Sequence, residues 1–177
     1  MSRTAHLRDQ NGFTLIELLV VVGMIGILSV AILATLNPIE QIQKGKDAKR
    51  KSDLAQIQRA LELYYQDWGR YPPHTFNYTG AANYQIISTD ANDLVKEWGT
   101  SWTPYMERLP KDENQQKRYI YYSPDQQRFY LYASLDRGGK DQQACNRGLA
   151  CGNVPATTTC GGTHVCNYGV SSLNAVP

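Results

Sequence analysis

The chain has 177 residues, a formal net charge of +2 and a pI near 8.3, which leaves room for one domain, or for one small domain with an appendage. So mild a charge argues against nucleic-acid binding as the main role, because that role needs concentrated positive charge. The mean hydropathy is −0.46, yet the segment from Phe13 to Leu36 is strongly apolar. The composition therefore predicts an ordinary soluble body that carries one hydrophobic appendage.

The apolar segment contains a single charged residue, Glu17, and its 24 residues exceed the ~20 that a helix needs to cross a bilayer. A buried core helix is one alternative, but so long a run exceeds what a domain of this size can bury. A cleaved secretory signal is another, with Arg3 and Arg8 as its basic region. The run is longer than a usual signal and no A-x-A pattern follows it, so we expect it to persist as a membrane span.

Basic residues flank the span on both sides, and they do not settle its orientation. Arg3 and Arg8 precede it, whereas residues 44–51 contain a denser group of lysines and one arginine. Counted by the positive-inside rule, the denser group places the large domain in the cytoplasm. The cysteines and the resemblance described below predict the opposite orientation.

A second helical segment follows the span. Asn37-Pro38 is expected to interrupt or kink the helix, because proline lacks a backbone donor and disfavours helix at the residue before it. Apolar residues then recur at helical spacing: Leu54, Ile57, Leu61, Tyr64 and Trp68, with Ala60 and Leu63 beside them. Gly69 and the Tyr71-Pro72-Pro73 sequence end this helix. The two parts would extend ~84 Å, too far for one small domain to bury. The first part therefore needs lipid or neighbouring copies as partners.

The region after the helices predicts a small sheet. Residues 72–92 are expected to form a surface loop and Asp93–Trp98 a short helix. Tyr119–Tyr122, a turn at Ser123–Gln126 and Phe129–Leu135 predict a hairpin. In the second strand Phe129, Leu131, Ala133 and Leu135 would face the helix, and Tyr130, Tyr132 and Ser134 would face water. The fold class is therefore α+β, with a helix laid on a small antiparallel sheet.

The segment 136–177 holds all four cysteines in two C-x5-C pairs, Cys145 with Cys151 and Cys160 with Cys166. Four cysteines suit disulfides or a zinc site, and zinc favours shorter C-x2–4-C spacing with nearby histidine. His164 lies between the second pair. Pairing within each C-x5-C unit is the simplest arrangement, and crossed pairing stays open.

The N-terminal residues resemble a known family signature. A short basic leader ends in Gly12, Phe13 follows, Glu17 lies four residues later, and a long apolar helix continues as GFTLIELLVVV. This order resembles the N-terminus of type IV pilins and of the pseudopilins of type II secretion. The stretch from Asp53 to Pro72 is similar to the helix end of major-pseudopilin-like members, and the whole resemblance covers residues 1–73.

The resemblance implies processing and a domain plan. A prepilin peptidase would remove the leader, residues 1–12, by cutting between Gly12 and Phe13, and would methylate the new amino group of Phe13. Residues 13–37 would form the transmembrane and assembly helix. Residues 38–177 would form the globular pilin-like domain, in which the helix packs on a small antiparallel sheet and a disulfide-linked, loop-rich tail occupies residues 136–177.

The resemblance also implies a structural function. The subunit would wait in the membrane, with the leader cytoplasmic and the globular domain outside, and then polymerise into a type II secretion pseudopilus or a type IV pilus. An inner-membrane platform and its ATPase would drive that step. A minor pilin that binds a surface or DNA at the filament tip is the alternative. An enzyme is not expected, since the sequence has no G-x-S-x-G, H-E-x-x-H or phosphate loop.

Glu17 gains a partner under this resemblance. An isolated acid inside a span costs on the order of 3 kcal/mol, so such acids are normally paired. The methylated amine of Phe13 in an incoming subunit could lie against Glu17 of a neighbour, which would neutralise both charges. The alternative is that Glu17 extends to the lipid headgroups from near the helix end.

The resemblance bears on cysteines and metal as well. An extracytoplasmic location favours disulfides over zinc at Cys145, Cys151, Cys160 and Cys166. Major pseudopilins often hold calcium in the loop after the sheet, where this chain has Asp136 and Asp141. Two acids are few for the six to eight oxygens that calcium prefers. We therefore expect no cofactor, with weak calcium binding as the alternative, and a solvated basic face at Lys44–Lys51.

Overall fold

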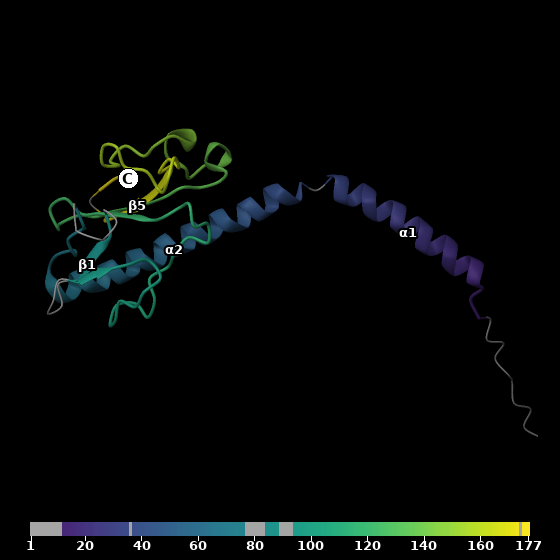
Figure 1. Cartoon of the computed structure of the whole chain (residues 1–177), viewed down its shortest axis with the longest axis horizontal. Helices are drawn as coiled ribbons and strands as arrows, with labels where there is room; N and C mark the ends of the chain where they lie inside the picture. The colour runs from purple at the N-terminus through teal and green to yellow at the C-terminus, as the bar shows by residue number, and fades with distance from the viewer. Residues whose placement is uncertain (1–11, 36, 77–83, 89–93, 174) are drawn as a thin grey trace, which may run out of the picture. The chain divides into compact units, whose positions relative to one another are not determined.

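The computed structural model describes residues 12–35, 37–76, 84–88, 94–173 and 175–177. The chain divides into two compact units, Met1–Gln41 and Ile42–Pro177. Figure 1 shows the elements along the chain. The proposed leader lies outside the described residues apart from Gly12.

Helix α1, Leu15–Thr35, forms most of the first unit, and its side chains from Leu15 to Ile32 are exposed. The predicted interruption at Asn37-Pro38 is confirmed, because α2 begins at Pro38. Proline suits the first position of a helix, where its missing N–H is not needed. The Asn37 side chain accepts a hydrogen bond from the Glu40 N–H at 3.3 Å, which is the arrangement of an N-cap.

Helix α2, Pro38–Trp68, contributes the core of the second unit. The predicted apolar stripe is confirmed at four positions that are fully buried or nearly so: Leu54, Ile57, Leu61 and Tyr64. Ala60 is buried as predicted, whereas Leu63 and Trp68 are about half exposed, so their assignment to the core is wrong. The helix ends at Gly69, whose φ of 65° and N–H bond to the Tyr65 carbonyl form a left-handed cap.

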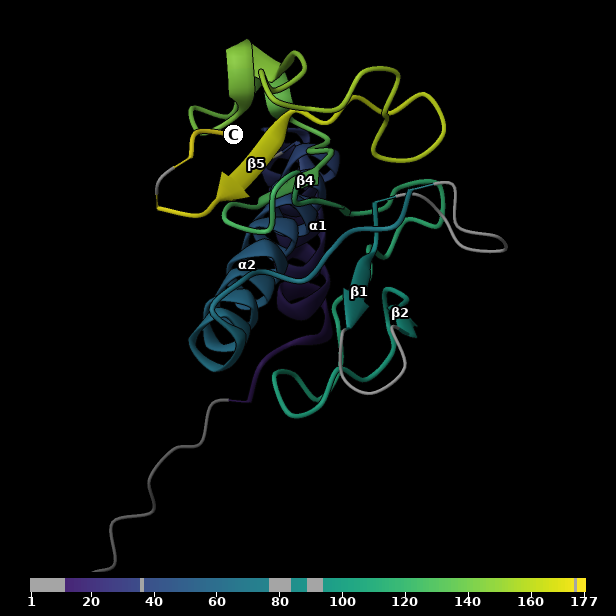
Figure 2. The same cartoon turned by 90° about the vertical axis from the view of Figure 1, so that its left-hand side faces the viewer.

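A three-stranded antiparallel sheet packs on this stripe. Strand β3, Ile120–Tyr122, pairs with β4, Tyr130–Ala133, and β4 pairs with β5, Tyr168–Ser171, in the order β3-β4-β5. The predicted hairpin is confirmed, and β4 and β5 lie side by side in Figure 2. The tail supplies β5, which the sequence did not predict because its Tyr-Gly-Val-Ser run is short and interrupted by glycine.

A second, two-stranded sheet corrects two predictions. Strand β1, Ile86–Ser88, pairs antiparallel with β2, Leu94–Lys96. The expected loop over residues 72–92 therefore contains a strand, and the expected helix at Asp93–Trp98 is wrong. Its described part pairs across the ladder, with Val95 opposite Ile87, and this pairing overrides any local helix preference. Residues 77–83 and 89–93 lie outside the described residues.

The outer face of the main sheet also differs from the prediction. Tyr130, Tyr132 and Ser134 were expected to face water, yet all three are buried. The cysteine-containing tail covers them, and Cys151 and Cys160 pack in one apolar cluster with Tyr130 and Tyr132. The globular unit therefore has three layers: α2, the sheet and the tail.

Two disulfides hold the tail, Cys145–Cys151 and Cys160–Cys166. Their Cα–Cα distances are 5.0 and 5.1 Å, within the usual range for a disulfide. The predicted pairing within each C-x5-C unit is confirmed. All four sulfurs are used in these bonds, so the zinc alternative is wrong for these cysteines.

Reduction of both disulfides is expected to lower the stability of the globular unit. Each closes a short loop worth ~2 kcal/mol in the chain-entropy model, and the loops cover the tyrosines of β4. Denaturant titration of the full chain, oxidised against reduced and alkylated, measures the change. Chain alkylated without reduction is the control, and equal unfolding midpoints for all samples would contradict the tail's role as a covering layer.

Candidate functional site

Glu17 lies in the first turn of α1, where it caps the helix. The Thr14 N–H and hydroxyl each donate to Glu17 Oε2 at 2.9 Å, and the Glu17 N–H donates to Thr14 Oγ1 at 3.3 Å. This reciprocal arrangement is a capping box, which satisfies backbone donors at the helix start. The sequence prediction gave Glu17 no such local role, although the T-x-x-E spacing was a sufficient signal.

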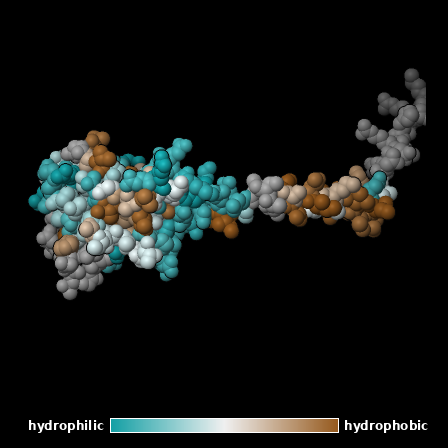
Figure 3. Space-filling model, turned by 90° about the horizontal axis from the view of Figure 1, so that it is seen from above, coloured by the Kyte–Doolittle hydropathy of each residue, from teal (hydrophilic) through white to brown (hydrophobic). Residues whose placement is uncertain are grey.

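The remainder of α1 offers an uninterrupted apolar surface. The 18 residues from Leu15 to Ile32 have a mean hydropathy of 2.7 and none is buried, so by length and composition this helix can cross a membrane. Figure 3 shows apolar surface along the segment and a mainly hydrophilic globular unit. Phe13, which precedes the capping box, is 86% exposed. Apart from Glu17 the helix has no charge, so this carboxylate is its one electrostatic feature.

A buried ionic cluster joins α2 to two loops of the globular unit. The Arg50 guanidinium, 3% exposed, donates to both carboxylate oxygens of Asp112, at 2.7 and 3.2 Å, and to Asp47 and Asp136 at 2.8 Å each. Lys117 Nζ donates to Asp136 at 2.6 Å. Charges this deeply buried are tolerated when they are paired and hydrogen-bonded, as here. The cluster is the electrostatic link between α2 and the end of the sheet.

The cluster corrects the expected solvated basic face. Arg50 is buried, and Lys51 Nζ contacts Asp141 at 2.6 Å, so both residues belong to the packed domain. Lys44 and Lys46 are exposed as expected. Sequence reasoning missed the cluster because two of its three carboxylates, those of Asp112 and Asp136, lie more than 60 residues beyond Arg50 in the chain.

The two aspartates considered for calcium are held by cationic side chains. Burial raises the pKa of Asp136, but hydrogen bonds from Lys117 and Arg50 outweigh it and leave that pKa below its usual value. Burial likewise opposes the hydrogen bond from Lys51 to Asp141, and the net pKa is again lowered. Within the described ranges, no group of three or more His, Cys, Asp or Glu could hold a metal. In this structure both carboxylates are therefore paired with cationic side chains.

His74 of the globular unit packs among aromatic side chains. His74 lies between Tyr84 and Tyr122 with ring-centroid distances of 5.6 and 5.0 Å, and its Nδ1 is 2.9 Å from the Ser123 carbonyl. Burial lowers the pKa of this imidazole, with an opposing contribution from that carbonyl. The neutral ring therefore serves as part of an aromatic stack.

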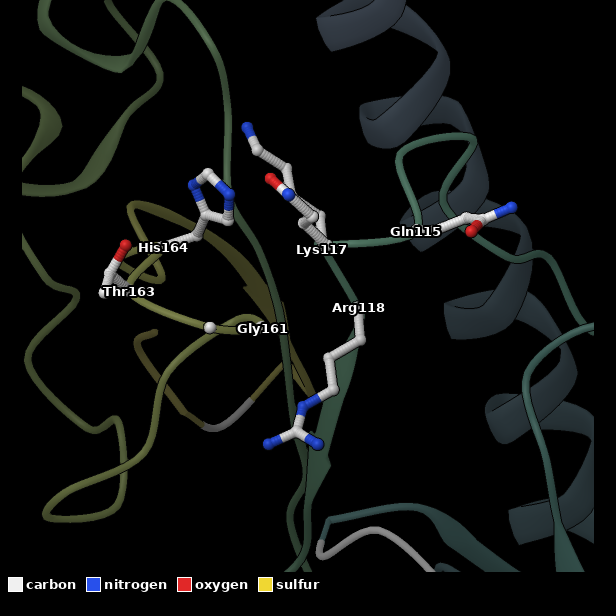
Figure 4. A pocket seen from close by; sticks show the side chains of 8 residues that line it. Gln115, Lys117, Arg118, Gly161, Thr163 and His164 are labelled. Atoms are coloured by element: carbon white, nitrogen blue, oxygen red, sulfur yellow. The ribbon is translucent and has the colours of Figure 1, made fainter.

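His164 lines the hollow shown in Figure 4, which has a volume of about 490 Å³. The hollow lies between residues 115–118 and the turn at residues 161–164, and its lining includes no carboxylate. Lys117 is committed to Asp136, and Arg118 points away from His164 in Figure 4. The lining residues therefore form no acid–base pair.

Comparison with known proteins gives matches to two family models. A prokaryotic N-terminal methylation motif matches residues 7–33, and the type II secretion system protein G model matches residues 37–150. The first match contains Glu17 and the Gly12-Phe13 junction. The second contains the β3–β4 hairpin and the ionic cluster, and it ends before β5. The two matches follow one another along most of the chain.

Curated relatives carry the same family name. Type II secretion system core protein G of Aeromonas hydrophila is 31% identical over 105 residues, which cover 59% of this chain and 68% of the relative. The protein of that name from Pectobacterium carotovorum is 38% identical over 103 residues, 58% of this chain and 61% of the relative. That from Pseudomonas aeruginosa is 28% identical over 134 residues, 76% and 88%. The chain spans about two thirds of the length of the first two relatives.

No solved structure matches the chain. The assignment therefore rests on the two family models, the named relatives and a structure that has the long apolar helix, the small antiparallel sheets and the disulfides expected of a pilin-like fold. The minor-pilin alternative is not favoured by these matches. The chain belongs to the type II secretion system protein G family, the pseudopilins that assemble into the secretion pseudopilus.

Proposed function

We propose that this pseudopilin is made as a precursor, that a prepilin peptidase cleaves it between Gly12 and Phe13 and methylates Phe13, and that Glu17 then pairs with the Phe13 amine of a neighbouring subunit. The observation that carries the proposal is an apolar helix with no buried residue from Leu15 to Ile32, whose single charge lies in its first turn, four residues after Phe13.

The capping box makes the pairing chemically reasonable. Both Thr14 hydrogen bonds go to Oε2 of Glu17, so Oε1 can accept from a cationic amine without breaking the cap. Cleavage creates that amine, and contact with it offsets the cost of an acid in the span, on the order of 3 kcal/mol. A helix stack that repeats this contact fixes the axial step between subunits.

The proposed topology has the leader in the cytoplasm and the globular unit outside it. Two disulfides support this, because disulfides persist in oxidising compartments. The basic residues after the span favour the opposite orientation by the positive-inside rule. In the folded unit three of these charges are paired with acids: Lys49 with Glu113, Arg50 with Asp112 and Lys51 with Asp141. The subunit would be held in lipid as a single-pass protein until it is extracted into the filament.

The remaining partners follow from this cycle. The prepilin peptidase, the inner-membrane assembly platform and its ATPase would act on the subunit, which itself performs no catalysis. The cavity at His164 and the stacked His74 support that reading, since neither presents an acid–base pair. Nucleic acid is not expected as a main partner at this net charge.

Mass spectrometry of the protein from the membrane fraction tests the processing. We expect an N-terminal peptide that begins with methylated Phe13. Cells without the peptidase should yield the uncleaved chain, which is the control. A mature N-terminus elsewhere, or cleavage after the span, would contradict the proposal.

We infer further that Lys51, Lys117 and Arg50 supply the positive charge that calcium would otherwise bring to Asp136 and Asp141. Adding calcium or EDTA is therefore expected to leave the thermal unfolding midpoint of the full chain unchanged. If calcium bound the folded chain, a free concentration of 100 times its Kd would raise the free energy of unfolding by ~2.7 kcal/mol, which calorimetry detects easily. Magnesium at equal ionic strength is the control, and a midpoint that rises with calcium alone would contradict the inference.

A further inference from the structure

Helix α2 carries two exposed patches at different heights. The lower patch is Ile42, Gly45 and Lys46, in the first turns of the helix that belong to the globular unit. The upper patch is Leu63 and Asp67, near the helix end. Ile42 is 59% exposed and Leu63 is 50% exposed, so each patch combines an apolar side chain with a charged one.

The described contacts of the chain do not explain why position 45 is a glycine. Glycine in a helix interior destabilises the helix relative to alanine. A Cβ at Gly45 would meet nothing within 4 Å among the atoms described, and its φ is not in the left-handed range. Neither local packing nor backbone geometry therefore requires glycine here, whereas close approach of another chain would.

The upper patch borders an apolar groove. Leu63 lines it together with Arg59, Glu62 and Leu173, and the groove has a volume of about 490 Å³. Leu173 is fully exposed beside it. An aliphatic side chain from another molecule would remove both leucines from water.

The spacing of the patches sets a register. Leu63 lies 21 positions after Ile42, and Asp67 lies 21 positions after Lys46. Within each patch the apolar and charged residues are four apart, which places them on one helix face. Two parallel copies of α2 displaced by 21 residues, ~31 Å at 1.5 Å per residue, would therefore align both pairs at once.

We propose that in the pseudopilus α2 of one subunit packs beside the parallel α2 of a neighbour displaced by about 21 residues along the axis, with Ile42 in the Leu63 groove and Lys46 against Asp67. The position of Gly45 opposite Gln66 lets the backbones approach. The proposal deepens the family's self-assembly and does not depend on the Glu17 pairing.

A second copy is the partner that fits, for two reasons. A filament of identical subunits pointing one way uses heterologous contacts, in which one patch meets a different patch of the next copy. The charges are complementary. In its own chain Lys46 is near Glu113, which Lys49 already pairs, and Asp67 bonds to neutral Tyr105.

Charge reversal tests the register in cells that assemble the pseudopilus. Lys46→Asp and Asp67→Lys should each lower the yield of sheared filaments by about tenfold or more, because like charges would face each other. The double variant should recover to within about threefold of the parent, since the pair is restored in reverse. Single variants that assemble normally, or a double variant no better than the worse single, would overturn the proposal.

Gly45→Leu separates assembly from folding. It should raise the thermal midpoint of the full chain in detergent, because leucine favours helix, while lowering filament yield by about tenfold. Gly152→Leu is the matched control, since a Cβ there also meets nothing within 4 Å, and it should assemble normally. Normal assembly of Gly45→Leu would contradict the proposal that the α2 backbones of two subunits approach each other closely at Gly45. If Glu17→Gln assembled normally, the Glu17 pairing would be contradicted, but the register of the α2 helices would not. The two proposals can therefore fail separately.

Discussion

Replacing Glu17 with glutamine is expected to abolish pseudopilus formation while leaving a processed, membrane-held protein. Glutamine has the same shape and can still accept the Thr14 hydrogen bonds, because either residue completes a capping box. Only the charge is lost. Removing a charge from a span also favours membrane retention, by on the order of 3 kcal/mol. The defect should therefore appear at assembly and not at insertion.

Quantifying sheared filaments, cleaved protein and membrane-bound protein in the same cells distinguishes these steps. We expect a loss of more than about tenfold in filaments, since the neighbour's amine would be buried without a counter-charge. Thr14→Ala is the control, because it removes the two hydroxyl bonds of the capping box and keeps the carboxylate, and it should still assemble. Normal filament yield from Glu17→Gln would show that the carboxylate acts only as a cap.

Replacing Arg50 with methionine is expected to cause the largest loss of folding stability of any single change considered. The variant leaves Asp47, Asp112 and Asp136 facing each other without the guanidinium that each now contacts. Breaking a buried ion pair by removing one partner costs 3–5 kcal/mol. Denaturant titration of the full chain in detergent, followed by tryptophan fluorescence, measures the change, since Trp102 lies in the core.

Lys49→Met is the matched control for that experiment. It removes the cation next to Arg50 in the sequence. Lys49 pairs with Glu113, and both side chains are about half exposed. Exposed ion pairs contribute little because water screens them. An Arg50 variant as stable as the Lys49 variant would contradict the view that the buried cluster ties α2 to the sheet.

Local patterns predicted the elements whose stability depends on nearby residues. The apolar span, the interruption at Pro38 and the Leu54–Tyr64 stripe follow from periodicity and proline chemistry. The β3–β4 hairpin follows from two β-rich runs around a turn. The disulfides followed from spacing together with the family resemblance.

Features that depend on distant segments were missed. Tyr130 and Tyr132 were predicted to face water because the cysteines that pack on them lie about 20 to 35 residues later in the chain, in a segment with no periodic pattern. Strand β2 read as helix because only its pairing with β1 makes it a strand. Arg50 was interpreted as a surface charge because two of the three acids that it contacts, Asp112 and Asp136, are more than 60 residues away in the sequence. The capping role of Glu17 was different, since T-x-x-E was visible in the sequence.

A cryo-electron microscopy map of filaments sheared from cells that express this chain would show directly whether Glu17 pairs with the Phe13 amine of a neighbouring subunit. We expect helical filaments in which the Phe13 amine of one subunit lies within ~3 Å of Glu17 of a neighbour. Filaments in which Glu17 contacts only its own Thr14, with the Phe13 amine placed elsewhere, would contradict it.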